Sequence, residues 1–154
     1  MIATAVIAVI IALPIQRAAI QKRGREWVAS QNGHVRFSYK YNVLTDQWDH
    51  YASLPAPGWL IATLGIDFFD TVDTVELDNM EVKDLSPIVD LQSLRQLAIF
   101  IEIDDNLDFA PLAELPKLEL VYLDYTDISA ERLAKLRVLL QKARVVATNH
   151  PPPK

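Results

Sequence analysis

Residues 72–77 read VDTVEL, residues 94–99 read LRQLAI and residues 118–123 read LELVYL. In each segment the first, fourth and sixth positions are apolar, as in Val72, Val75 and Leu77. Successive segments begin 22 and then 24 residues apart, inside the range of roughly 20 to 29 residues of one kind of short repeat. The spacing therefore predicts three copies of one structural unit.

A second match follows the first two of these segments. Residues 84–88 read DLSPI and residues 108–112 read DFAPL, with proline at the same place. Proline fixes the backbone angle φ, so both segments are expected to make the same tight turn. Such a segment folds back over the inward side of a short strand, and neighbouring units must stack because one alone buries too little. The alternative is a set of unrelated strands with a chance leucine pattern.

On these segments the chain resembles the leucine-rich repeat proteins of bacteria, in particular the class with 22-residue repeats. Over nearly its whole length it is similar to short membrane-anchored proteins of that class. This wider likeness rests on the apolar start and on QRAAIQKR at 16–23, GHVRF at 33–37, PGWL at 57–60, LG at 64–65 and DFF at 67–69. The resemblance implies an α/β fold, namely a short leucine-rich-repeat solenoid of about three repeats with parallel strands, a helical N-terminal anchor and helical caps.

The sequence departs from that repeat at one position. The place usually taken by asparagine is Met80 in the first repeat and Thr126 in the third. The hydroxyl of Thr126 is able to form a hydrogen bond, whereas Met80 is not expected to do so.

The first residues are strongly apolar. Residues 2–15 contain only Thr4 and Pro14 as exceptions, and a membrane span needs roughly 17 to 20 apolar residues. Counting from Met1, with Gln16 and Arg17 reaching toward the headgroups, meets the lower limit. We therefore expect an uncleaved single-pass membrane anchor over residues 1–20. A buried core helix and a cleaved signal peptide are the alternatives. Against the signal peptide, no basic stretch precedes Ile2 and no small-residue cleavage pattern follows the apolar run. The basic residues Arg17, Lys22, Arg23 and Arg25 follow the apolar run, which by the positive-inside rule favours a cytoplasmic position for the rest of the chain. A true start further upstream that adds basic residues would reverse this orientation, so the side of the membrane stays open.

The caps are predicted from local signals. A helix is expected to stop at Asn32 and Gly33, followed by an alternating strand and a polar surface loop over residues 42–56. A short helix over 57–64 closes at Gly65, and the aromatic and aliphatic residues near it are expected to seal the first coil: Trp59, Leu60, Leu64, Phe68 and Phe69. At the other end Ser129 is expected to cap a helix, and a last strand includes Val145 and Val146.

The expected organisation is an anchor at 1–20, a helix, strand and cap at 21–71, repeats at 72–128, a cap helix and strand at 129–148 and a disordered tail at 149–154.

Composition limits the possible partners. The net charge is −5, and residues 67–131 hold seventeen acids against Lys83, Arg95 and Lys117. A body of that charge repels phosphate backbones, so no nucleic-acid partner is expected. The chain has no cysteine, which excludes disulfides and thiolate chemistry.

Catalytic and metal-binding patterns are weak, so we expect a non-enzymatic protein without a cofactor. Asp46, Asp49 and His50 could suggest a metal site, but a solvated loop is the favoured explanation for them. The run that contains Asp104, Asp105, Asn106 and Asp108 lacks the glycine and the distal glutamate of a calcium loop.

The remaining candidate is the exposed side of the predicted strands. Because side chains alternate along a strand, the residues between the inward positions share one surface. These are Glu76, Asp78, Ala98, Phe100, Tyr122 and Asp124. Aromatic residues bordered by acids are typical of a surface that binds a protein or peptide, here one with basic residues. Two alternatives stay open: Phe100 only covers the surface beside a longer turn, or the protein is a structural, envelope-associated one without a specific ligand.

Overall fold

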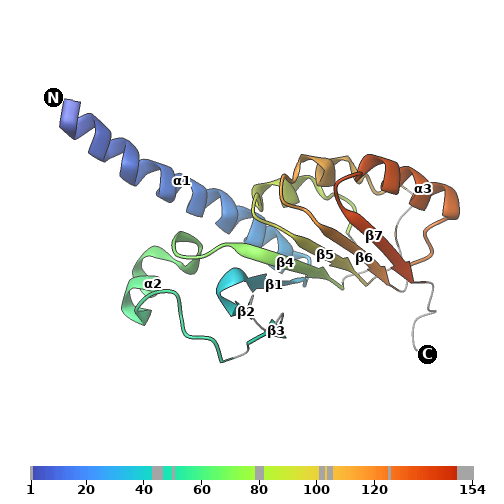
Figure 1. The fold of residues 1–154 in the computed structure, drawn as a ribbon, viewed down its shortest axis with the longest axis horizontal. Helices are drawn as coiled ribbons and strands as arrows, with labels where there is room; N and C mark the ends of the chain where they lie inside the picture. The colour runs from blue at the N-terminus through green and yellow to red at the C-terminus, as the bar shows by residue number, and fades with distance from the viewer. Residues whose placement is uncertain are drawn as a thin grey trace.

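The computed structural model describes residues 2–42, 47–49, 51–78, 82–100, 103, 106–124 and 126–148, with only the backbone of 2–11 and 42. These residues form an α/β structure with a mostly parallel five-stranded sheet and three α-helices (Figure 1). The helices are α1 (Ile2–Ser30), α2 (Gly58–Leu64) and α3 (Ala130–Leu139). The strands are β1 (His34–Phe37), β2 (Tyr41–Asn42), β3 (Gln47–Trp48), β4 (Val72–Leu77), β5 (Gln96–Ile99), β6 (Leu120–Asp124) and β7 (Arg144–Thr148). Short 3-10 helices are η1 (Ser38–Lys40), η2 (Ile66–Phe68), η3 (Ser86–Asp90) and η4 (Ala110–Glu114).

The sheet has the strand order β1-β4-β5-β6-β7. Strands β4 to β7 are parallel, and β1 pairs antiparallel with β4 at the edge. In the register, Leu77 lies beside Ile99, and Ile99 lies beside Leu123. The prediction that these three residues stand on neighbouring parallel strands is therefore confirmed.

The two proline segments take the same local structure. In η3 and η4 the aspartate that precedes the turn accepts a backbone N–H two residues on: Asp84 from Ser86 and Asp108 from Ala110, each at 2.8 Å. Proline stands at the start of both 3-10 helices, where a missing N–H costs no hydrogen bond. Behind these turns the inward residues form one core, which includes Leu85, Ile88, Leu94, Leu97, Ile99, Leu112, Val121 and Leu123. The predicted match of the two segments is confirmed.

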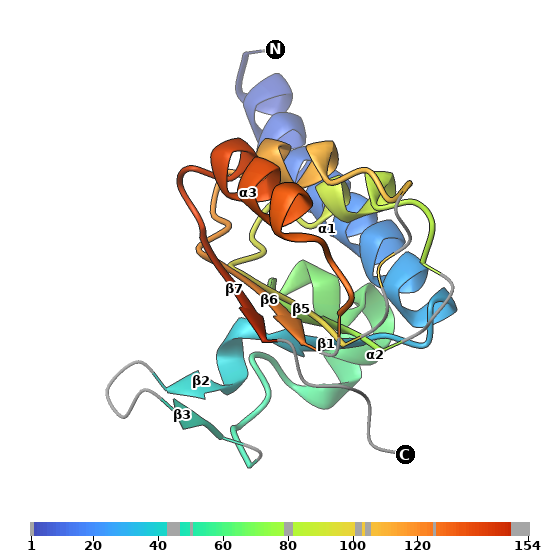
Figure 2. The same cartoon turned by 90° about the vertical axis from the view of Figure 1, so that its right-hand side faces the viewer.

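Helices α1 and α3, with the 3-10 helices η3 and η4, cover one face of the sheet, and the hairpin β2–β3 lies on the other side (Figure 2). The C-terminal half of α1 covers the first coil, and Val28 is fully buried there. A Cβ atom on Gly24 would lie 2.9 Å from Leu91, and one on Gly33 would lie 2.8 Å from the Glu76 carbonyl oxygen. Of the residues near α2 that were predicted to seal the first coil, Trp59 is 72% and Leu64 is 48% exposed, so the prediction is wrong for these two, whereas Leu60, Phe68 and Phe69 are half-buried.

A buried polar cluster fixes α1 to the body. Arg25 donates from Nε and Nη2 to both carboxylate oxygens of Asp67 at 2.9 to 3.2 Å. Gln21 donates to Asp67 at 3.1 Å and accepts the backbone N–H of Val72 at 3.2 Å. The Asp67 side chain is only 3% exposed, and its hydrogen bond and charge raise the pKa of Arg25 above its ordinary value. The guanidinium of Arg25 therefore compensates the negative charge of the Asp67 carboxylate, which is almost completely shielded from water.

The expectation of a membrane anchor over residues 1–20 is wrong. Among the described residues, none of the helices combines the length and the apolar character that a membrane crossing requires. Helix α1 continues unbroken to Ser30, and its second half packs on the protein through Gln21 and Val28. The expected localisation as a single-pass membrane protein is corrected accordingly. The apolar run alone suggested an anchor because its length stands at the lower limit for a span.

The C-terminal cap agrees with the sequence. Ser129 is the N-cap of α3 and accepts the backbone N–H of Arg132 at 3.2 Å. Strand β7 follows and extends the parallel sheet.

Thr126 differs from expectation, because its hydroxyl is buried and has no hydrogen-bond partner among the described residues. Met80 and the tail at 149–154 lie outside the described residues.

Replacement of Arg25 by alanine is expected to lower the free energy of unfolding by about 3 kcal/mol, because it leaves the Asp67 carboxylate buried without its counterion. Urea unfolding followed by circular dichroism measures this change. The matched control is Arg23→Ala, which removes an exposed ion pair to Asp90 and should cost less than about 1 kcal/mol. Equal losses in the two variants would contradict the structural role of Asp67.

Thr126→Val is expected to raise the free energy of unfolding by about 1 kcal/mol. The substitution keeps the shape of the side chain and removes a buried hydroxyl that forms no hydrogen bond within the part of the chain that the structure describes. Thr63→Val serves as the control, since the Thr63 hydroxyl is exposed and donates to the Trp59 carbonyl. A clear loss of stability in Thr126→Val would show that the hydroxyl has a partner.

Candidate functional site

The candidate site is the face of the sheet that the helices leave open. All six predicted residues lie on or directly after strands β4, β5 and β6, at positions that alternate with the buried ones. The register places Glu76 beside Ala98 and Ala98 beside Tyr122. Asp78 and Phe100 follow the last paired residues of β4 and β5, and the Phe100 N–H donates to the Leu77 carbonyl at 2.8 Å. The structure therefore brings the predicted residues together in two neighbouring rows.

An aromatic pair occupies the middle of these rows. The rings of Phe100 and Tyr122 have centroids 6.1 Å apart and an interplanar angle of 61°. Both side chains are half-buried. An edge-to-face pair of this kind leaves ring faces available to a ligand, and these faces attract cations.

Carboxylates border the pair. Asp124 accepts hydrogen bonds from the Tyr122 hydroxyl at 3.4 Å and from the Thr148 hydroxyl. Asp78 has a half-exposed side chain whose carboxylate lies 3.9 Å from Nε2 of His34. Glu76 forms an ion pair with Arg36. Asp78 and Asp124 therefore add negative charge on both sides of Phe100, while Arg36 neutralises Glu76.

Sequence reasoning missed the part of the face that β1 and the hairpin contribute. The guanidinium carbon of Arg36 lies 5.5 Å from the centroid of the Trp48 ring, and Trp48 contacts Tyr41 with centroids 5.3 Å apart. Under them is a hollow of about 180 Å³ that Thr74, Gln96 and Leu120 also line. The prediction of a loop over residues 42–56 is wrong at β3, because Gln47 and Trp48 pair with β2. Trp48, a large apolar residue in an otherwise polar stretch, was the feature of the sequence that could have indicated this contact.

Among the described residues, no three His, Cys, Asp or Glu side chains lie close enough together to bind one metal ion. Asp46, His50, Asp104 and Asp105 lie outside the described residues. Asp108 instead accepts the N–H of Ala110 within its own turn. The open face thus offers aromatic rings and hydrogen-bond acceptors, which suit binding.

The N-terminal edge of the sheet carries a second arrangement of charges. Arg95 donates to both carboxylate oxygens of Glu119, at 3.1 and 2.8 Å, and lies 3.7 Å from Asp73. The hydrogen bond with Glu119 raises the pKa of Arg95, and the same bond lowers the pKa of Glu119 below its ordinary value. Asp73 lies on β4, and Arg95 and Glu119 directly precede β5 and β6 at equivalent positions, so the charges support the parallel register.

Comparison with protein-family models, with curated proteins and with solved structures finds no match for this chain. The resemblance to leucine-rich repeat proteins therefore rests on the residues quoted above.

Substitution of Arg95 by glutamine is expected to raise the pKa of Glu119 toward its ordinary value of 4.5. Because the folded-state pKa is lowered, the pair stabilises the fold above the unfolded pKa, and this contribution is lost as pH falls through the folded pKa. NMR titration of the Glu119 side chain measures the shift. Arg137→Gln is the control and should leave the pKa of Glu119 unchanged. An unchanged pKa of Glu119 in Arg95→Gln would show that the ion pair does not form.

Proposed function

We propose that this chain is a non-enzymatic binding module that holds a protein or peptide segment with basic residues on the open face of its sheet. The observation that carries the proposal is the half-buried edge-to-face pair of Phe100 and Tyr122 on the open face, bordered by the carboxylates of Asp78 and Asp124. A lysine or arginine side chain would place its charge over a ring face and donate hydrogen bonds to a carboxylate.

The dimensions of the face favour a chain segment over a single small cation. Neighbouring strands lie about 4.8 Å apart, so the backbones at Asp78 and Asp124 are separated by roughly 10 Å. In an extended segment, side chains two and four residues apart point to the same side and lie about 7 and 13 Å apart, so the long side chains of two lysines are able to reach both carboxylates. The segment would therefore run across the strands, with Phe100 and Tyr122 beneath its middle.

We further propose that the repeats form a short solenoid of the leucine-rich type. Support comes from the equal inward positions of β4, β5 and β6 and from the matching turns at η3 and η4. In such a stack the strand side is a continuous surface whose length grows with the number of coils. Recognition by rows of residues from several strands fits that architecture.

The experiment compares wild type with the variant that carries both Phe100→Ala and Tyr122→Ala. The probe is a fluorescent twelve-residue peptide of alternating lysine and serine, with a glutamate and serine peptide as the negative probe. Fluorescence anisotropy is expected to show about tenfold weaker binding of the lysine peptide to the variant, because each lost cation–π contact contributes about 0.5–1 kcal/mol.

The matched control is Tyr51→Ala, which removes an aromatic ring that is 96% exposed outside the site. It should leave the affinity unchanged, and circular dichroism should show the same fold for all variants. Equal affinity of wild type and the double variant for the lysine peptide would refute the site.

A further inference from the structure

The hollow beside Arg36 and Trp48 extends the open face beyond the aromatic pair. Its volume is about 180 Å³, and its lining is more apolar than polar. It forms because Ala98 has a small side chain. In the register Ala98 stands between Glu76 and Tyr122, whose longer side chains reach further from the sheet. A space for one large side chain therefore opens over Ala98 in the middle of the sheet.

The hollow is electrically neutral. Of its lining residues only Arg36 and Glu76 carry charge, and they form an ion pair with each other. The guanidinium of Arg36 also lies over the Trp48 ring, 5.5 Å from its centroid, so this ring already has a cation. Arg144, whose neighbour in the register is Leu120, adds an exposed positive charge just outside the lining. A second cation from a ligand is therefore disfavoured in the hollow, and an uncharged side chain is favoured.

The walls offer aromatic rings and one free hydrogen-bonding group. Trp48 and Tyr122 line the hollow from the hairpin and from β6. The Thr74 hydroxyl donates to Asp73 at 3.1 Å. The half-buried amide of Gln96, in contrast, forms no side-chain hydrogen bond within the described part of the chain. An amide in this position favours a ligand that brings its own polar group, because a partly buried polar group gains from being paired.

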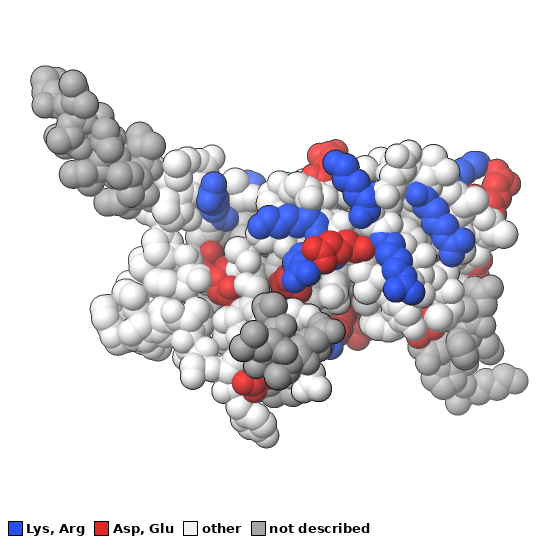
Figure 3. Space-filling model, in the orientation of Figure 1, with Lys and Arg blue, Asp and Glu red and all other residues white. Residues whose placement is uncertain are grey.

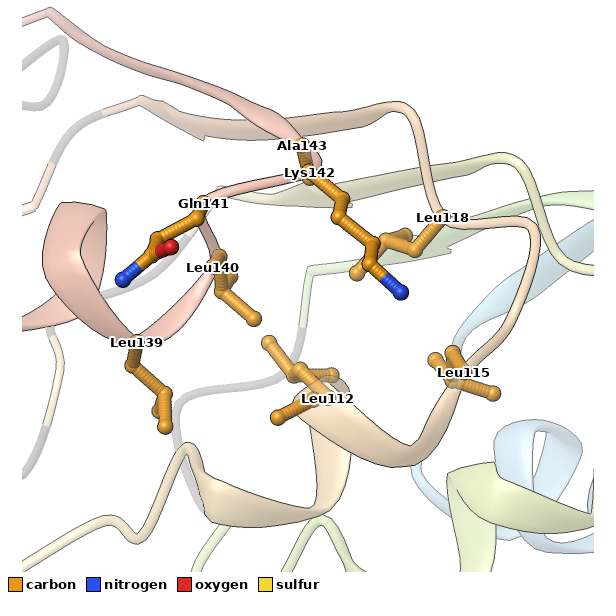
Figure 4. Close-up of a pocket in the computed structure, with 9 residues that line it drawn as sticks. Leu112, Leu115, Leu118, Leu139, Leu140, Gln141, Lys142 and Ala143 are labelled. Atoms are coloured by element: carbon orange, nitrogen blue, oxygen red, sulfur yellow. The ribbon is translucent and has the colours of Figure 1, made fainter.

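A hollow on the helical side provides a contrast. This leucine hollow lies between η4 and the turn that connects α3 to β7, and its volume is about 210 Å³. Figure 4 shows leucine side chains around it and the Lys142 side chain extending toward Leu115. Figure 3 shows Lys and Arg side chains over α1, α3 and the sheet, and few of them around α2. The lining of the leucine hollow includes no aromatic ring, so an aromatic ligand should distinguish the two hollows.

We propose that the hollow over Ala98 binds a tyrosine side chain of the same partner segment that places its basic residues beside Phe100 and Tyr122. This inference rests on the proposed function, since it names a further residue of that segment. The ligand's ring would pair with those of Trp48 and Tyr122 in an offset or edge-to-face arrangement, and its hydroxyl would donate to the Gln96 side-chain oxygen. Ala98 lies two residues before Phe100, or about 7 Å along the strand, so one segment is able to reach both places.

The experiment uses the full chain and four versions of the fluorescent lysine and serine peptide. One central serine is replaced by tyrosine, phenylalanine, leucine or alanine, and fluorescence anisotropy measures each affinity. The tyrosine peptide is expected to bind about tenfold more tightly than the alanine peptide, because it adds aromatic contacts. It is expected to bind about threefold more tightly than the phenylalanine and leucine peptides, because only tyrosine forms the hydrogen bond with Gln96.

Two variants test the floor and the amide separately. Ala98→Leu fills the floor and should bring the ratio of the tyrosine and alanine peptide affinities close to one. Gln96→Met keeps the length of the side chain without its amide, and should make the tyrosine and phenylalanine peptides bind equally. The matched control is Ala134→Leu at an exposed position on α3, which should keep both ratios. Circular dichroism monitors the fold of each variant.

A probe without basic residues separates this inference from the proposed function. In NMR spectra, N-acetyltyrosinamide is expected to shift the signals of the Ala98 methyl group and the Trp48 indole, and to leave the methyl signals of Leu139 in the leucine hollow unchanged. If the lysine peptides fail to bind but the probe shifts these two signals, the basic segment is refuted and the aromatic site stands.

Other results would overturn the inference. Lysine peptides that bind equally well whatever their central residue would refute the tyrosine site and leave the proposed function in place. A leucine peptide that binds more tightly than the tyrosine peptide would show that the hollow selects aliphatic side chains. Equal affinity ratios in Ala98→Leu and Ala134→Leu, or probe shifts confined to Leu139, would place the aromatic contact elsewhere.

Discussion

The structure depends on the burial of aliphatic side chains in rows that cross the parallel strands. Val75, Leu97, Val121 and Val145 form one row, and each contacts the next strand at the same register position. Burial of such a side chain contributes about 1.5–3 kcal/mol, but a single strand with its turn leaves one side of its row in water. Each strand therefore gains its stability from its neighbours in the sheet. A shift of register by one residue would turn these side chains outward, which is why the row fixes the alignment so firmly.

The two ends of the stack are closed in different ways. At the first coil, α1 approaches closely at Gly24 and Gly33 and is joined to the body through Arg25 and Asp67. At the last coil, α3 covers the core mainly through Leu136 and Leu140. The first end combines close packing with a buried ion pair, whose partners must be present together. The last end relies on aliphatic contacts and leaves the leucine hollow at its border.

The sequence predicted the repeating part of the fold well because the period of its apolar residues is a direct consequence of strand geometry. The matching DLSPI and DFAPL segments, the N-cap at Ser129 and the last strand were also recognisable from local chemistry. Long-range choices were less accessible. Trp59 and the residues near α2 had the composition of a seal, yet α1 takes that place, because packing against Leu91 depends on the small Gly24. The apolar start suggested a membrane helix, and although the helix was expected to run on to Asn32, composition alone does not reveal that its second half packs on the protein through Gln21 and Val28.

For the candidate site, alternation along the strands was sufficient to group Phe100, Tyr122 and the acids on one face. The contribution of Arg36 and Trp48 was not predictable in this way, because β1 pairs antiparallel with β4 and the hairpin follows from contacts distant in sequence. A single residue such as Trp48 does not form a repeating pattern, so its position in the fold was not predictable from the sequence. Patterns of apolar residues thus located the surface but not the side chains that border it.

The separation in sequence of the contacting elements has a consequence for how the chain folds. Parallel strands β4 to β7 join segments close along the chain, so their pairing requires the closure of short loops. The contact of α1 with η2 spans 46 residues, as the Gln21 to Asp67 hydrogen bond shows. Since longer loops cost more entropy to close, the parallel strands are able to pair before the N-terminal helix docks. Until it docks, the aliphatic layer beneath Leu91 is in contact with water, so the order of assembly determines how long the nascent chain is prone to self-association.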